Sequence, residues 1–212
     1  MERKYNQNIR ENDPTYLLRQ VQELLLIAST NKNSSALIYA CLDSRIASEI
    51  LDLKIMLHSV SVEERNIIVE ESKSKNGIDR VNKKQGSLKE KYQLFFQAVC
   101  EILSVDAKFY DFKKSKDIQY KLSTSIHSYY MTNEDLKYNS VLMQNAIIII
   151  NEFQTFLTTS FPIKNESLIM TGINIATIPD NDKQILEEWK SSSSMSYEEL
   201  KNRLKENQKF QN

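Results

Sequence analysis

The sequence predicts an all-α protein, a bundle of five or six main helices followed by a less regular C-terminal appendage. Glycine and proline occur only three times each among 212 residues, well below the roughly 7% and 5% that are usual. Sandwiches and barrels need many turns, which these residues supply, and a phosphate-binding loop needs a glycine pattern. The shortage disfavours those classes and leaves helices joined by short polar breaks.

The first two predicted helices begin at clear capping residues. Asp13-Pro14 starts one, because the carboxylate can accept from free amides and proline suits the first turn. Ser34 or Ser35 starts a longer helix that runs to about His58 and is apolar on almost every side over 36–42. We expect its inward stripe to consist of Tyr39, Leu42, Ile46, Ile50, Leu53 and Leu57.

The middle of the chain contains two capping-box patterns, in which serine and glutamate satisfy each other's end-of-helix amides. The first, Ser61 with Glu64, opens a polar helix that Asn76-Gly77 terminates. Residues 77–87 are interpreted as a basic connector. The second box, Ser87 with Glu90, precedes an amphipathic stripe made of Tyr92, Phe95, Phe96, Val99, Ile102 and Leu103.

Two further helices are predicted over 112–130 and 133–157. The first should point Ile118, Leu122, Ile126 and Tyr129 inward, and Thr132 can cap the second. The four isoleucines at 147–150 favour a strand by propensity alone. However, the helical pattern continues on both sides of them, so we predict a helix that is buried nearly all round.

We expect a domain boundary near the Phe161-Pro162 step. Residues 1–161 would form the bundle and 162–212 the appendage, in which 167–178 resemble a short strand or hairpin. The serine run at 191–194 is interpreted as a flexible joint. Ser196 can cap a thin, charged last helix that ends near Phe210.

The composition indicates which binding partners and which cellular compartment to expect. The 28 basic and 28 acidic residues balance, so no global field attracts nucleic acid or lipid. Cys41 and Cys100 sit in apolar helical patterns with no paired spacing, which predicts neither a disulfide nor a metal site, and no cofactor is expected. No signal peptide or membrane-spanning run is recognised. We therefore expect a soluble, cytoplasmic protein with no membrane partner.

The candidate site centres on His127, one of two histidines in the chain. Its ordinary pKa, near 6.5, suits a general acid or base, but a histidine here could equally donate a hydrogen bond inside the bundle. The neighbouring Tyr129 and Tyr130 could stack on RNA bases. Tyrosines at this spacing are also typical of a core with a wet hydroxyl group.

A second group of polar residues interrupts the apolar helix over 34–58. Arg45 and Glu49 are four residues apart and can form an ion pair, with Asp43 and Asp52 nearby. The group is either a solvated stripe with one ordinary ion pair or an arginine and a carboxylate that point into a site.

Two stretches together resemble the HEPN superfamily of helical bundles. They are SALIYACLDSRIASEILDLKIML and, much later, LSTSIHSYYMTNEDLKYNSVLMQNAIIIINEFQTFL. The resemblance covers roughly 36–157. It implies a metal-independent ribonuclease or an inactive, partner-binding relative of one. In that family an arginine precedes the catalytic histidine by four to six intervening residues. At the matching position before His127 this chain has Lys121, which keeps the charge but lacks the planar fork of arginine.

Two functional hypotheses follow from the resemblance. In the first, the chain belongs to a bacterial defence or toxin–antitoxin-type system and cuts RNA. His127 would then be the acid or base, Lys121 would neutralise the phosphate, and Arg45 or Glu49 would orient them. In the second, the chain is a non-catalytic interaction subunit that dimerises or holds a larger effector protein through its appendage. Helices that are apolar on more than one side need covering, and the resemblance implies a composite site made by two chains, so we expect a homodimer with His127 and Tyr130 near the interface. The alternative is a monomer whose other helices cover those faces.

Overall fold

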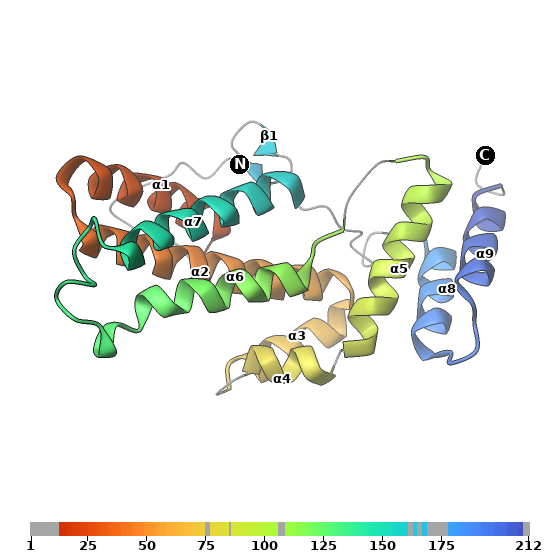
Figure 1. The fold of residues 1–212 in the computed structure, drawn as a ribbon. Coiled ribbons are helices and arrows are strands. Elements are labelled where there is room, and N and C mark those ends of the chain that lie inside the picture. The colour runs from red at the N-terminus through yellow and green to blue at the C-terminus, as the bar shows by residue number, and fades with distance from the viewer. Residues whose placement is uncertain are drawn as a thin grey trace. The chain divides into compact units, whose positions relative to one another are not determined.

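A computed structural model describes residues 13–74, 77–84, 86–105, 109–160, 163–164, 167–168 and 178–209 (Figure 1). The all-α prediction is confirmed. The helices are α1 (Pro14–Asn31), α2 (Ser34–His58), α3 (Val62–Ser72), α4 (Gly77–Lys84), α5 (Gly86–Ile102), α6 (Phe112–Ile126), α7 (Val141–Ser160), α8 (Asp180–Ser191) and α9 (Tyr197–Lys209), with a 3₁₀ turn η1 (Ser128–Tyr130).

The strand structure within the described residues is a single short pair. Strands β1 (Ile163–Lys164) and β2 (Ser167–Leu168) are antiparallel, with Ile163 opposite Leu168. A short strand or hairpin was expected over 167–178, and β2 occupies the first two of those residues. Positions 169–177 lie outside the described residues.

The chain forms two compact units, and each is built from two separate stretches of sequence. Unit 1 comprises 1–52 and 111–170, and unit 2 comprises 53–110 and 171–212. This division differs from the expected one at 161. The segment that was expected to form a C-terminal appendage supplies α8 and α9, which pack against α5 within unit 2.

In unit 1, α1, α6, α7 and the larger part of α2 run alongside one another (Figure 1). Asp13 caps α1 as predicted, its carboxylate accepting from the backbone N–H groups of Thr15 and Tyr16 at 2.9 and 3.4 Å. The isoleucine run lies within α7, as predicted, but the expectation that this helix is buried nearly all round is wrong, because Val141 and Ile148 are 79% and 63% exposed. The buried apolar residues of the unit include Leu17, Val21, Leu37, Leu51, Ile118, Leu122, Met143, Ala146, Ile150 and Phe153.

The inward stripe predicted for α2 is wrong. Tyr39 is 59% exposed, whereas the fully buried positions on this helix include five small residues, Ala40, Cys41, Ser44, Ala47 and Ser48, together with Leu37, Leu51, Ile55 and Met56. The error follows from choosing the largest apolar side chains on a helix that is apolar on several sides. Small residues at these positions let neighbouring helices approach closely, which periodicity alone does not reveal.

The segment between α6 and α7 also differs from the prediction. Helix α6 ends at Ile126, and α7 begins at Val141 rather than near Asn133. Thr132 and Asp135 do cap each other, but they close an isolated turn, with Thr132 Oγ1 donating to the Asp135 carboxylate at 2.7 Å. The Ser140 hydroxyl accepts from the backbone N–H of Met143 at 3.2 Å at the start of α7.

Unit 2 begins with the predicted capping box of Ser61 and Glu64, which is present at the start of α3. Residues 77–84 form helix α4 rather than a connector, and α4 packs against α3. Gly77 permits this, because a Cβ at that position would lie 2.2 Å from the backbone oxygen of Ser72. The second predicted capping box is not where α5 begins, since that helix starts at Gly86.

Helices α5, α8 and α9 share an apolar core in unit 2. Its buried members are Tyr92, Phe95, Ala98, Leu186, Trp189, Leu200 and Leu204. The ammonium group of Lys91 donates to the backbone oxygens of Trp189, Lys190 and Ser192 at 2.8, 2.8 and 2.5 Å, which satisfies the end of α8. In return, Trp189 Nε1 donates to the Lys91 carbonyl at 2.9 Å.

Candidate functional site around helix α6

Helix α6 positions the predicted histidine at its C-terminal end. Asp111 caps the start of the helix by accepting from the N–H of Lys114 at 2.9 Å. At the other end, the N–H of His127 donates to the Ser123 carbonyl at 3.1 Å, and the chain then leaves the helical conformation. His127 is exposed, so the alternative of a histidine inside the core is wrong.

The tyrosine pair lies directly after the histidine and is also exposed. Tyr129 and Tyr130 are 88% and 59% exposed, and their rings meet edge to face with centroids 5.1 Å apart. The Tyr130 hydroxyl donates to the Thr124 carbonyl at 3.1 Å, which holds that ring against the last turn of α6. The prediction that Tyr129 points into the core is therefore wrong.

Lys121, the cation expected to neutralise a phosphate, is already paired. Its ammonium group lies 2.7 Å from a carboxylate oxygen of Asp117 and 3.4 Å from one of Glu152 on α7. The hydrogen bond to Asp117, reinforced by the charge of Glu152, raises the pKa of Lys121 above its usual value. A second lysine, Lys114, lies 3.6 Å from Glu152. Two cations and two anions thus balance on this side of α6.

Arg45 faces a different neighbour. Its Nε lies 2.9 Å from Glu49 Oε1, as the spacing predicted, and its Nη1 donates to Ser123 Oγ at 2.8 Å. The Ser123 hydroxyl in turn donates a hydrogen bond to the Gln119 carbonyl at 2.7 Å. Arg45 and Glu49 therefore contact each other and the α2 side of α6, whereas Lys121 is paired with α7. The contacts do not bring the predicted catalytic residues together.

Further along α2 from Arg45, a buried network of polar side chains joins α2 to α6. Ser115 donates to one Asp52 oxygen at 2.8 Å and Gln119 to the other at 2.9 Å, while Ser48 lies 2.8 Å from Ser115 and accepts from Gln119 at 2.9 Å. Asp52 is only 5% exposed. Of these four residues, sequence reasoning identified only Asp52. The pairs at spacing four, Ser48 with Asp52 and Ser115 with Gln119, were the available signal.

The two cysteines are free and carry no chemistry that the structure supports. Burial raises the pKa of the Cys41 thiol to about 12, partly offset by a hydrogen bond with Ser125, and burial also raises the pKa of Cys100. A thiol with a raised pKa is a poor nucleophile. The expectation that both behave as small hydrophobes is consistent with this environment.

The second histidine, His58, ends helix α2 in unit 2. Its Nδ1 is buried and has no hydrogen-bond partner among the described residues. Burial, followed by the charges of Arg65 and Lys54, lowers the pKa of His58 below its ordinary value. An imidazole held neutral in this way is a poor proton donor near neutral pH.

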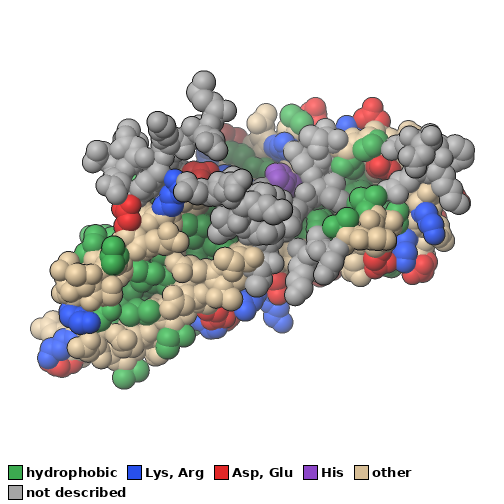
Figure 2. All heavy atoms as spheres, turned by 90° about the horizontal axis from the view of Figure 1, so that it is seen from above, with side chains coloured by type: hydrophobic (Ala, Val, Ile, Leu, Met, Phe, Trp, Pro, Cys, Tyr) green, Lys and Arg blue, Asp and Glu red, His purple; other side chains and the backbone are tan. Residues whose placement is uncertain are grey.

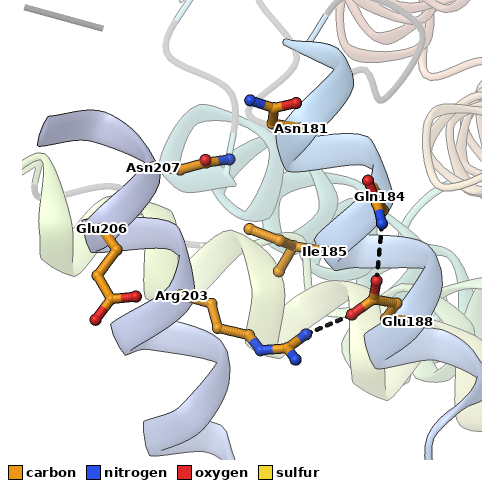
Figure 3. Close-up of a pocket in the computed structure, with 7 residues that line it drawn as sticks. All are labelled: Asn181, Gln184, Ile185, Glu188, Arg203, Glu206 and Asn207. Carbon is orange, nitrogen blue, oxygen red and sulfur yellow. Dashed lines mark hydrogen bonds and ion pairs between the residues drawn. The ribbon is translucent and has the colours of Figure 1, made fainter. Parts of the chain in front are cut away.

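Unit 2 has an open hollow of about 350 Å³ between α8 and α9 (Figure 3). Asn181, Gln184, Ile185, Glu188, Arg203, Glu206 and Asn207 line it. Arg203 forms an ion pair with Glu188, which also accepts from Gln184 at 3.1 Å (Figure 3). Among the described residues that line the hollow, the one cation, Arg203, is thus neutralised by Glu188, and the geometry defines no ligand.

A second hollow, of about 520 Å³, lies at the C-terminal end of α5. Its apolar wall includes Phe96, Cys100 and Phe109, and its rim includes Gln97 and Glu101. Glu101 is engaged by Lys201 at 2.7 Å and by the Tyr197 hydroxyl at 2.9 Å, and these hydrogen bonds lower its pKa.

Within the part of the chain that the structure describes, no three His, Cys, Asp or Glu side chains are grouped so as to hold a metal ion. No helix among the described residues combines the length and the apolar character needed to cross a membrane. No protein-family model, curated protein or solved structure matches this chain. What the protein does therefore has to be inferred from its own residues.

Proposed function

We propose that the chain is a non-catalytic helical interaction subunit, one that dimerises or holds a larger effector protein. The proposal rests on the ion pairs that Lys121 already forms with Asp117 and Glu152. A phosphate would have to displace two carboxylates, at 2.7 and 3.4 Å, to reach the ammonium group. Because Lys114 offsets Glu152 in the same cluster, little net charge remains there to attract an anion.

The geometry of Arg45 supports the same proposal. A composite ribonuclease site needs a cation and a histidine that converge on one phosphate. Here the guanidinium group donates to Ser123 and Glu49, and His127 stands exposed at the end of α6. Each cation named as a candidate already has protein partners.

Cleavage of RNA in the presence of EDTA is the direct test. The purified chain is expected to leave a labelled single-stranded RNA intact at micromolar concentration, and the His127→Ala variant should behave identically. The matched control is a preparation of an unrelated metal-independent ribonuclease in the same buffer. Cleavage by the wild-type chain that His127→Ala abolishes would overturn the proposal and support the HEPN-like ribonuclease.

A second candidate function, RNA binding, rests on the exposed aromatic group. Tyr120 on α6 is 73% exposed and lies about two helical turns before His127, which precedes the exposed Tyr129 and Tyr130. Exposed rings beside a histidine could stack on bases, an interaction worth about 1–3 kcal/mol per base. Under this candidate, Tyr129→Ala weakens binding of a single-stranded RNA about tenfold by fluorescence anisotropy, whereas Tyr39→Ala, an exposed tyrosine on α2, leaves it unchanged.

A further inference from the structure

One face of helix α7 is exposed and carries no charge. Six exposed residues on this face recur with alternating spacings of three and four, and they are Val141, Gln144, Ile148, Asn151, Thr155 and Thr158; Asn145, beside them, is exposed as well. We call these six residues the α7 seam. Val141 and Ile148 are 79% and 63% exposed.

The spacing of the seam matches that of a helix that packs on another helix. Positions i, i+3, i+7, i+10 and i+14 are the a and d positions of a heptad, which form the contact stripe of a coiled coil. The branched residues Val141 and Ile148 occupy positions of one type, and Gln144 and Asn151 those of the other. Polar amides at such positions are known to select the number and alignment of the partner helices.

The charge pattern indicates what kind of surface would cover the seam. Glu152 is the only charged residue in α7, and it is paired within the chain by Lys121 at 3.4 Å and Lys114 at 3.6 Å. In Figure 2, the part of the molecule that contains α1 and α7 shows mainly apolar and uncharged side chains, with charged groups toward its edges. A charged partner would find no complementary charge on the seam, whereas a second copy of the seam would meet no repulsion.

We propose that two copies of this chain associate through the α7 seam, with the two helices antiparallel and a two-fold axis close to Ile148. Ile148 lies near the middle of the seam, so the Val141 end of one copy faces the Thr155 and Thr158 end of the other. The side-chain amides of Gln144 and Asn151 then lie where they can hydrogen-bond to polar partners across the axis. The proposal builds on the interaction function proposed above by naming a partner. It places the contact on α7, not around His127 and Tyr130 as expected from the sequence.

The oligomeric state is the first readout. In light scattering across a concentration series, the measured mass is expected to approach twice the chain mass of 24.7 kDa. Ile148→Asp places a charge at the axis and should return the mass to that of one chain. The matched control is Ile67→Asp on α3, an isoleucine that is 61% exposed and lies outside the seam, and this variant should remain a dimer. Circular dichroism checks that both variants retain their helices.

Engineered cysteines test the antiparallel arrangement, in a Cys100→Ser background that leaves only the buried Cys41. Ile148→Cys is expected to cross-link with its own copy on mild oxidation. Val141→Cys should not, because its copy would lie about 20 Å away along an antiparallel pair, well beyond disulfide reach. The double variant Val141→Cys/Thr155→Cys should cross-link at the ends.

Three outcomes would overturn the dimer proposal. They are a single-chain mass at every concentration, a dimer that Ile148→Asp leaves intact, and cross-linking of Val141→Cys by itself, which indicates parallel helices. None of these measurements involves RNA. The dimer proposal can therefore be wrong while the non-catalytic interaction function, which the cleavage assay tests, remains correct.

Discussion

Units 1 and 2 each have an apolar core, but in unit 1 one of the helix contacts also contains a buried polar network. In unit 2, α5, α8 and α9 share a core of aromatic and aliphatic side chains around Tyr92, Phe95 and Trp189. In unit 1, the contact between α2 and α6 passes through a buried carboxylate, two hydroxyls and an amide. Non-directional apolar packing tolerates replacements of similar volume, whereas a buried polar network requires every partner to be present.

Because Trp189 is the only tryptophan, its fluorescence reports on unit 2 while circular dichroism reports on the helices of both units. Recording both signals in one urea titration shows whether the two units unfold together.

Replacing Trp189 with alanine should have the largest effect. The side chain is 5% exposed, packs in the unit 2 core and donates to the Lys91 carbonyl. Truncation of a buried tryptophan costs about 3–5 kcal/mol of unfolding free energy. Urea titration followed by circular dichroism measures it. Trp189→Phe, which keeps most of the apolar volume, should cost clearly less, and equal losses would show that packing is not what Trp189 contributes.

Replacing Asp52 with alanine should have the next largest effect, a loss of about 2–4 kcal/mol of unfolding free energy. The substitution leaves hydrogen-bond donors of Ser115 and Gln119 without their acceptor in a buried site. The same titration measures this loss. Asp117→Ala is the matched control, because Asp117 is an acid on the exposed side of α6 whose ion pair is solvated, and it should change stability by about 0.5 kcal/mol or less. Similar losses of unfolding free energy for the two variants would contradict the structural role of the buried polar network between α2 and α6.

The smallest effects are expected at Lys32 and Ser104, the two non-glycine residues with positive φ in the described part of the chain. Lys32 (φ 53°) follows α1 in unit 1, and Ser104 (φ 54°) follows α5 in unit 2. Glycine adopts this conformation without strain, so Ser104→Gly should raise the unfolding free energy by about 1 kcal/mol. Lys32→Gly should gain less, because the Lys32 ammonium group lies 5.0 Å from the Tyr138 ring centroid and that contact is lost. Thermal melts compare the two, and a larger gain at Lys32 would contradict this account.

Much of the local structure could be predicted from the sequence because it depends on neighbours in the chain. The Asp13 cap, the Ser61–Glu64 capping box and the helical isoleucine run were all predicted correctly. The Arg45–Glu49 pair was also correct, since a spacing of four residues on a helix brings the two side chains together. Such features need no knowledge of which helices later become neighbours.

What only the tertiary structure decided is which helix covers which face. Helix α2 is apolar on several sides, and the side that is buried in the structure contains small residues such as Ala40 and Ser44. The pairing of Lys121 with Glu152 joins residues 31 positions apart, and that of Asp52 with Gln119 joins residues 67 apart. The grouping of 171–212 with 53–110 likewise depends on contacts between distant segments. Helical periodicity specifies a face of each helix, but its partner is set by the packing of side chains that are far apart in the sequence.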